Sequence, residues 1–94
     1  MPASPSHAVN EHLVVGASPV GFASQLNNVT GAVFRCENGP MRYTVDGQTP
    51  TPTFGRLVVD MDDVPLPSRY EVQNFQAVRV GTTNADIHAV IYYG

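Results

Sequence analysis

Residues 32–55, AVFRCENGPMRYTVDGQTPTPTFG, decide the fold of this 94-residue chain. From Ala32 to Cys36 apolar side chains occupy every second position, which is the period of a strand with one face in the core. A second strand with the same period follows at residues 41–45. We therefore predict that the two strands form a hairpin in the core, with the Cys36 side chain pointing inward.

The residues between these strands predict how the chain turns. Asn38 followed by Gly39 is typical of a tight hairpin turn, but Pro40 lacks the N–H group that closes a two-residue loop. We expect a three-residue or bulged connection instead. On the second strand Arg42 falls on the polar face, so we predict that it points outward and contacts a partner.

A stiff loop follows the second strand. Its sequence, QTPTPT at residues 48–53, contains two prolines, each of which biases the preceding residue toward extended angles and removes a backbone donor. We predict an extended, exposed loop that loses little conformational entropy when it docks on another molecule. The residues that we expect to contact a partner there are Thr49, Pro50, Thr51, Pro52 and Phe54.

Short alternating segments and turn residues continue through the rest of the chain. Eight glycines and eight prolines interrupt it, and no helical period extends beyond a turn or two. We predict further strands at residues 12–15, 56–61 and 85–93, and an edge segment at residues 64–69. In the second of these strands Leu57, Val59 and Met61 share one face. About six or seven short strands separated by turns are typical of a single all-β domain, either a small sandwich or a small barrel.

The predicted strand at residues 85–93 has one apolar face and one mixed face. The mixed face carries Asp86, His88, Val90 and Tyr92, so it is half apolar, which is more than a side in contact with solvent needs to be. Tyrosine combines apolar area with a polar tip and is enriched in interfaces. This face is either a partner surface or a surface covered by the Thr-Pro loop. We predict that His88, Val90 and Tyr92 contact a neighbouring subunit.

A flexible N-terminal arm at residues 1–10 is predicted to precede a domain at residues 11–94. The arm is rich in Pro, Ser and Ala and has no apolar period that could bury a face. It is either a frayed terminus or a segment that becomes ordered on a neighbouring subunit. In the second case Pro5, His7 and Val9 contact that neighbour.

Charge and composition exclude several classes of protein. The formal net charge is −3, and the basic residues are five scattered arginines without a lysine, whereas nucleic-acid binding needs clustered cations. No apolar run approaches the length of a membrane-spanning helix, and no export signal is recognisable at the start. We expect a soluble chain that is not exported and binds neither nucleic acid nor membrane.

We find no pattern of residues for catalysis or for metal binding. The three histidines lack a metal-ligand spacing, and no nucleophile has a flanking base motif. The acidic residues Asp60, Asp62 and Asp63 are typical of a solvated turn rather than of a calcium loop. We predict a non-enzymatic protein without a cofactor or a metal, in which Cys36 is a buried packing residue.

Two segments resemble a known family. The series GPMRYTVDGQTPT at residues 39–51 and NFQAVRVGTTNADIHAVIYY at residues 74–93 resemble small structural proteins of tailed bacteriophages. In those proteins an Arg-Tyr strand, an Asp-Gly turn with a downstream Pro-Thr, an Asn-Phe segment and a closing strand ending in aromatics recur in this order. The resemblance covers residues 12–94, and the VPLPS stretch at residues 64–68 departs from it.

The resemblance implies a compact subunit of the virion with the fold of a small antiparallel β-sandwich or jelly roll, specifically a capsid cement or decoration protein. Such proteins sit as trimers where capsomers meet and clamp the major capsid protein. The arm and the Thr-Pro loop would then bind the capsid surface, and the closing strand would contact other subunits, after assembly in the bacterial cytoplasm. The alternatives are another virion position, such as a head-tail, collar or tail-fibre module, and a sandwich-type carbohydrate-binding module with exposed tyrosines as sugar platforms.

Overall fold

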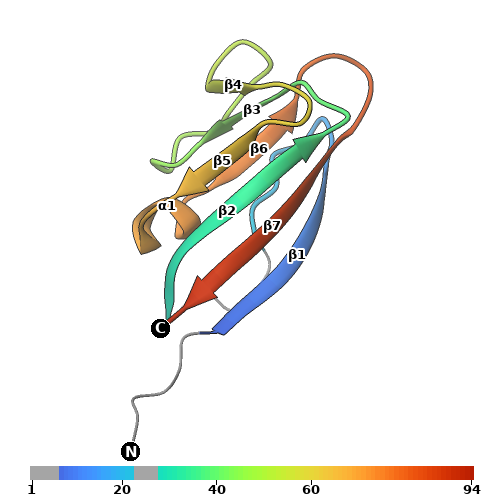
Figure 1. Ribbon diagram of the computed structural model, residues 1–94. Helices are drawn as coiled ribbons and strands as arrows, with labels where there is room; N and C mark the ends of the chain where they lie inside the picture. The colour runs from blue at the N-terminus through green and yellow to red at the C-terminus, as the bar shows by residue number, and fades with distance from the viewer. Residues whose placement is uncertain (1–6, 23–27) are drawn as a thin grey trace, which may run out of the picture.

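Two antiparallel sheets, which face each other across one core, form the protein (Figure 1). The computed structural model describes residues 7–22 and 28–94. The elements are β1 (His7–Val15), β2 (Val29–Glu37), β3 (Met41–Thr44), β4 (Arg56–Val58), β5 (Asp63–Leu66), α1 (Arg69–Gln73), β6 (Gln76–Arg79) and β7 (Ala85–Tyr93). One sheet has the strand order β1-β7-β2-β5, and the other has the order β4-β3-β6. The prediction of an all-β domain is confirmed.

Aromatic side chains from both sheets meet in the core. Phe34 of β2 is fully buried, and its ring centre lies 5.7 Å from that of Tyr43 in β3 and 5.2 Å from that of Phe75. Rings of this size bury more apolar area than any other side chains in the core. Cys36 is also buried, as its place in the alternating pattern predicted.

β2 and β3 do not form the hairpin that we predicted, because they belong to different sheets. Asn38 has a φ of 60°, which turns the chain out of the first sheet directly after β2. Pro40 has no N–H to donate back toward β2, and its carbonyl accepts a hydrogen bond from the N–H of Val80 at 3.1 Å. The connection after β2 therefore carries the chain across the core and onto the second sheet.

The strand that we predicted at residues 56–61 is shorter in the structure, and the side chains that we expected to share its buried face point outward. β4 ends at Val58, which is buried opposite Met41 of β3. Leu57, Val59 and Met61, which we expected on one face of a strand, are all about half exposed. Their alternation is that of a strand, but the register of β4 against β3 turns Val58 into the core and Leu57 outward.

β7 lies between β1 and β2 in the four-stranded sheet, and its bounds match the strand predicted at residues 85–93. β1 begins at His7, so residues 7–10, which we predicted as part of a flexible arm, belong to the sheet. The two strands are equally long, and each β1 residue from His7 to Val15 lies opposite a residue of β7. Residues 1–6 of the predicted arm lie outside the described residues.

The helix α1 joins β5 to β6, where we assigned no element from the sequence. Its N-terminus is capped by Ser68, whose side chain accepts a hydrogen bond from the N–H of Glu71 at 3.2 Å. Val72 is buried and fixes the helix against the core. Within the described residues, no helix is long and apolar enough to cross a membrane.

Candidate interaction surface

The outward side of the four-stranded sheet is not covered by any described residue, and we call it the open face. This side is turned toward the viewer in Figure 1, and no described element crosses it. Burial alternates along β7, so every second side chain points away from the core. The side chains on the open face are Ala8, Asn10, His12 and Val14 of β1, Asp86, His88, Val90 and Tyr92 of β7, Val33, Arg35 and Glu37 of β2, and Asp63 and Pro65 of β5.

Four of these side chains form what we call the apolar row. Val33 lies directly opposite Val90 on one side and Pro65 on the other, and Tyr92 follows two residues along β7 from Val90. Tyr92 is 43 % exposed and Val33 is 38 % exposed. Exposed apolar surface that is bordered by polar groups is typical of a site that contacts another protein.

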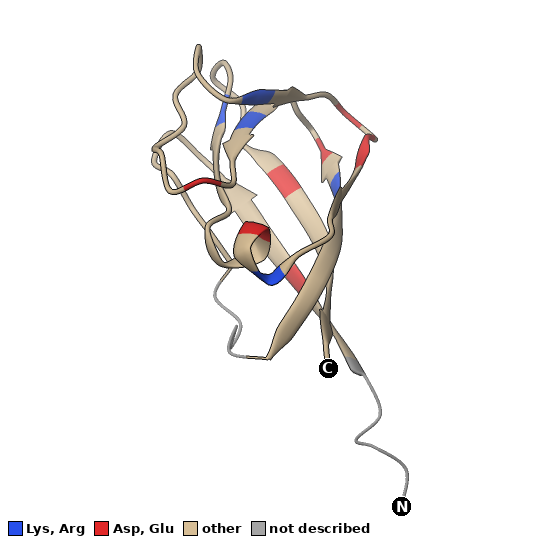
Figure 2. Cartoon of the chain, turned by 90° about the vertical axis from the view of Figure 1, so that its left-hand side faces the viewer, with Lys and Arg blue, Asp and Glu red and all other residues tan. Residues whose placement is uncertain are grey.

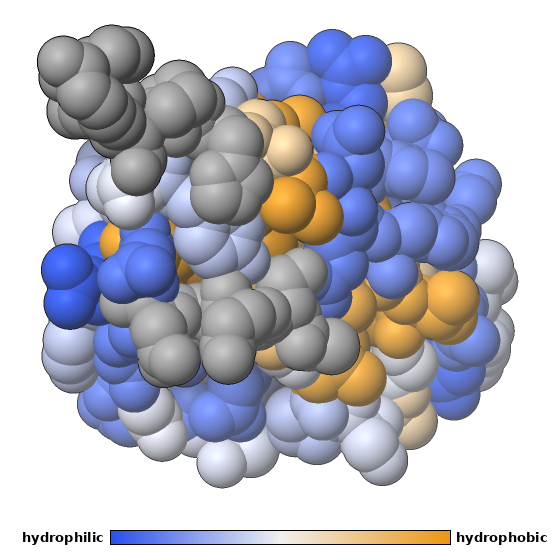
Figure 3. Space-filling model, turned by 90° about the horizontal axis from the view of Figure 1, so that it is seen from below, coloured by the Kyte–Doolittle hydropathy of each residue, from blue (hydrophilic) through white to orange (hydrophobic). Residues whose placement is uncertain are grey.

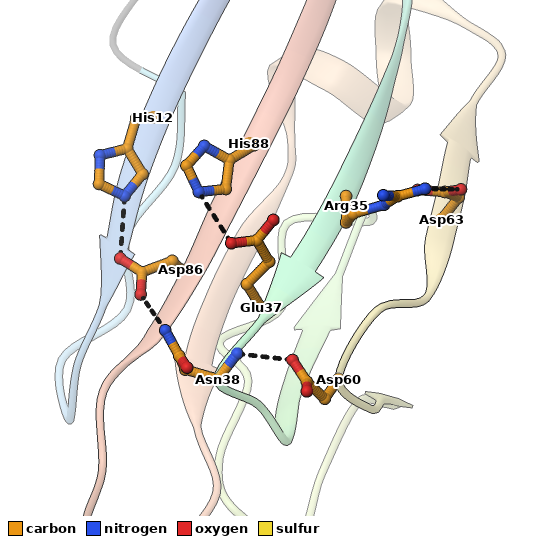
Figure 4. A network of polar contacts seen from close by, with 8 residues as sticks. All are labelled: His12, Arg35, Glu37, Asn38, Asp60, Asp63, Asp86 and His88. Atoms are coloured by element: carbon orange, nitrogen blue, oxygen red, sulfur yellow. Dashed lines mark hydrogen bonds and ion pairs between the residues drawn. The ribbon is translucent and has the colours of Figure 1, made fainter.

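A polar row runs beside the apolar row. His12, His88, Arg35 and Asp63 lie opposite one another across β1, β7, β2 and β5 (Figure 4). The His12 and His88 rings stack with their centres 4.6 Å apart and their planes at 6°. Arg35 holds Asp63 through Nε to Oδ1 at 2.8 Å and Nη2 to Oδ2 at 2.9 Å. These bonds lower the pKa of Asp63 and raise that of Arg35.

Two carboxylates border the stacked histidines. Asp86 Oδ1 lies 2.9 Å from His12 Nε2, and Asp86 Oδ2 accepts a hydrogen bond from Asn38 Nδ2 at 2.9 Å. Glu37 Oε1 lies 3.5 Å from His88 Nε2. The hydrogen bonds from Asn38 and then His12 lower the pKa of Asp86 from its usual value. The pair of His12 with Asp86 therefore ties the edge strand β1 to β7.

The lowered pKa of Asp86 predicts a loss of stability in acid. Its stabilising contribution is complete above the pKa of the unfolded chain, about 4, and is lost as the pH falls through the lower pKa of the folded state. We expect a loss below about 1 kcal/mol, because the site is open to solvent. Urea unfolding at pH 6 and pH 3 measures it. The variant Asp86→Asn should show a smaller difference between the two pH values, and an equal difference would contradict the assignment.

The open face brings together the three residues predicted on the closing strand. His88, Val90 and Tyr92 all lie on it, and no described part of the Thr-Pro loop covers them. The alternative interpretation, that the loop packs over this face, is therefore wrong. The reason is topological, because the loop belongs to the three-stranded sheet and lies on the other side of the core.

The Thr-Pro loop is a compact turn rather than an extended segment. Thr51 and Phe54 exchange two backbone hydrogen bonds, Thr51 N–H to Phe54 O at 2.9 Å and Phe54 N–H to Thr51 O at 3.1 Å. Pro50 is buried, so our prediction that it contacts a partner is wrong. The other four residues that we predicted as contacts here, Thr49, Thr51, Pro52 and Phe54, are exposed, and their contact with a partner stays a prediction.

Arg42 is hydrogen-bonded to this loop, and its contact with a partner stays a prediction. Its Nε donates to the carbonyl of Pro52 and its Nη1 to the carbonyl of Gly55, both at 2.9 Å. The side chain points to the outside of its sheet, as predicted, but the loop folds back over it. Its role is to hold the turn at residues 51–54 against β3.

Substitution of Arg42 tests this role. We expect Arg42→Ala to lower the free energy of unfolding by about 1–2 kcal/mol, because two hydrogen bonds from a charged donor are lost. Arg42→Lys should retain part of this, since a lysine reaches only as a single point donor. Urea unfolding measures both variants. An Arg42→Ala protein as stable as the wild type would show that the loop holds itself.

The predicted contacts of the N-terminal arm are only partly described. Pro5 lies outside the described residues, and His7 begins β1, but its side chain is not among those described. Val9 is 39 % exposed and lies opposite Ile91. Figure 3 shows the molecule from below, from the end at which β1 begins, and hydrophobic and hydrophilic surface lie side by side there.

Several residues of the open face were not predicted as contact residues. Val33 and Arg35 followed from the alternation in β2 as outward residues, but nothing local in the sequence indicated that β2 lies beside β7. The same holds for His12 and Pro65, which reach the face through β1 and β5. Arg42, Arg56 and Arg79 lie on the neighbouring strands β3, β4 and β6 of the other sheet, where Figure 2 shows blue segments close together.

The single cysteine of the chain does not lie on this surface. Cys36 is buried, and burial followed by the nearby carboxylates raises the pKa of its thiol to about 11. It is therefore a neutral packing residue at physiological pH. Among residues 7–22 and 28–94, no group of three or more His, Cys, Asp or Glu side chains is placed to hold a metal ion.

Three features of the open face lie at the surface of the molecule. They are a flat apolar row, a preformed Arg35–Asp63 pair and a hydrogen-bonded histidine pair. Comparisons of the chain with models of protein families, with curated proteins and with solved structures find no match.

Proposed function

We propose that this protein is a non-enzymatic structural protein of a tailed-phage virion, a cement or decoration protein that binds the shell of the major capsid protein. The observation that supports a binding role is the open face, which leaves the apolar row of Tyr92, Val90, Val33 and Pro65 in contact with solvent. The assignment to a virion rests on the resemblance of residues 39–51 and 74–93 to small phage structural proteins.

In this proposal the two sheets form a jelly-roll-like sandwich that acts as a rigid carrier for the docking surface. The protein is assembled in the bacterial cytoplasm, associates as a homotrimer and ends on the outer surface of the capsid. A small domain buries a modest fraction of its surface, so contact with neighbours adds stability that its own core does not supply.

The open face has the two parts that a specific contact needs. The apolar row supplies area that is removed from water, at about 25 cal/mol per Å². The polar row fixes orientation, because Arg35 and Asp63 are already paired and lose little side-chain freedom on binding. Polar groups that already have partners also lower the cost of excluding water from the contact.

Binding to capsids that lack the protein tests the proposal. We expect wild-type protein to bind such shells at saturation, and Tyr92→Ser combined with Val33→Ser to weaken binding at least tenfold, because both exposed apolar side chains are lost. The matched control is Tyr70→Ser, which removes an exposed tyrosine on α1, away from the open face. It should bind as wild type does.

Three outcomes would reject all or part of this function. Absence of wild-type binding to the shells rejects the capsid role. Equal binding by the double variant rejects the open face as the contact surface. Labelled protein confined to one vertex of the particle, instead of many copies over the shell, rejects cement in favour of a head-tail or collar position.

A further inference from the structure

Among the described residues, three of the four sheet edges are short or covered. β4 has three residues, and β5 has four and contains Pro65. The outer side of β6 is paired, because Val20 and Ala77 exchange backbone hydrogen bonds at 3.0 and 2.9 Å. Native proteins protect edges in these ways, since unpaired backbone groups accept further strands.

Among the residues that the structure describes, β1 is the one edge that is neither short nor interrupted by proline nor paired on its outer side. It has nine residues and no proline, and its partner among the described strands is β7 on one side. No backbone hydrogen bond described for the outer side of residues 8–14 connects it to another segment. A strand of this length and regularity offers a complete template for one more strand.

The backbone groups at this open edge follow from the hydrogen bonds of β7. Gly94, just after β7, donates its N–H to Asn28 on the β2 side at 3.1 Å. Because successive residues of a strand direct their backbone groups to opposite sides, the even residues of β7 point to β2 and the odd residues to β1. The β1 residues opposite the even ones therefore turn their N–H and C=O groups outward. They are Ala8, Asn10, His12 and Val14.

The stacked histidines agree with this assignment. His12 and His88 are directly opposite, and both turn their backbone groups away from each other. Such pairs are those in which the two Cα atoms, and hence the side chains, lie closest. The ring separation of 4.6 Å is what this kind of pair produces.

We propose that the outer edge of β1 binds an extended strand of a different protein chain by antiparallel strand addition. The N–H and C=O groups of Ala8, Asn10, His12 and Val14 supply the hydrogen bonds. The added strand extends the four-stranded sheet and its open face by one strand. This proposal goes beyond the proposed function and stands on the sheet edge alone.

Charge favours a foreign strand over a second copy of β1. A strand that pairs with all four of these residues places its central residue opposite Glu11. In a second copy that residue would be Glu11 itself, and like charges directly opposite are destabilising. A partner strand with lysine or arginine at its centre makes an opposite-charge pair instead. Val9 and Leu13, on the same side as Glu11, select apolar residues on either side of that cation.

The probe for this site is the capped synthetic peptide Thr-Val-Thr-Lys-Thr-Val-Thr, whose lysine falls opposite Glu11. Titration followed by amide NMR of the wild-type protein is expected to shift the N–H signals of residues 8, 10, 12 and 14 and to slow their hydrogen exchange. The same peptide with Glu in place of Lys should bind about three- to tenfold more weakly. Equal binding of the two peptides would overturn the stated chemistry.

Two changes that each remove backbone N–H groups, one in the protein and one in the peptide, test the edge itself. Asn10→Pro removes an outward N–H without touching the bonds to β7 and should abolish binding, whereas Asn10→Ala should keep it. With the wild-type protein, N-methylation of the third and fifth peptide residues, whose N–H groups face β1, should also abolish binding. The experiment with the N-methylated peptide does not depend on whether the proline variant folds.

Other results would overturn the proposal. Shifts confined to the open face, or none at saturating peptide, would show that the edge accepts no strand. Protection of the same four amides that rises with protein concentration, together with a dimer by light scattering, would show that a second copy occupies the edge. Failure of capsid binding leaves the proposal standing, because the peptide experiment uses no capsid.

Discussion

Replacement of Phe34 by Ala is expected to lower the free energy of unfolding by about 3–5 kcal/mol. The side chain is 0 % exposed and lies between the sheets, in contact with the rings of Tyr43 and Phe75. Its removal costs the apolar transfer free energy and leaves a cavity that the two flanking rings cannot close. In a domain with about 5–15 kcal/mol in total, much of the stability is lost.

The neighbour Val33 supplies the matched control for this substitution. Val33 lies in the same strand but its side chain faces outward. Val33→Ala should therefore lower the free energy of unfolding by less than about 0.5 kcal/mol. Urea unfolding of both variants, followed by tyrosine fluorescence and by far-UV circular dichroism, measures the difference. If Phe34→Ala cost no more than Val33→Ala, the two sheets would not share the core described above.

Gly55→Ala is expected to cost about 3 kcal/mol, for two reasons that act together. Gly55 has a φ of 121°, which L residues rarely adopt, and an added Cβ would lie 3.0 Å from the carbonyl oxygen of Tyr43. The obstacle is backbone of the adjacent strand, so it cannot move aside as a flexible side chain would. The Arg42 contact to the Gly55 carbonyl should be lost with it.

Gly81→Ala separates the two causes. Gly81 has a similar φ of 106°, but nothing lies within 4 Å of the position that a Cβ would take. We expect it to cost about 1–2 kcal/mol from backbone strain alone. Thermal unfolding of the two variants side by side gives the steric part as their difference. Equal melting temperatures would mean that β3 yields at Tyr43.

The local sequence pattern was enough to predict those strands that can be recognised without knowing which strand pairs with them. The alternation from residue 85 to residue 93 predicted β7 with its bounds, and the prolines of residues 64–69 predicted an edge, which β5 is. Both features depend on which side chains occupy neighbouring positions and on whether a residue has an N–H to donate. Neither depends on the identity of the strand alongside.

The candidate surface was harder to predict, because it is made of pairings between distant segments. His88, Val90 and Tyr92 were found from one strand, since a half-apolar outer side is visible in the sequence. Val33 and His12 reached the same surface through registers that join residues more than fifty positions apart. The Thr-Pro loop was predicted to be extended from its composition, but it forms a turn that Arg42 holds against the domain.

The sequence by itself determined that the chain is all-β and where most of its strands lie. It also determined that the side chains of Cys36 and Phe34 point into the core. These properties come from a two-residue period, which each strand carries within itself. Only the tertiary structure decided that residues 32–45 are split between two sheets, because Asn38 and Pro40 can end a strand but do not specify which strand the next segment joins. That choice depends on how the whole core fills, and it creates both the open face and the free edge of β1.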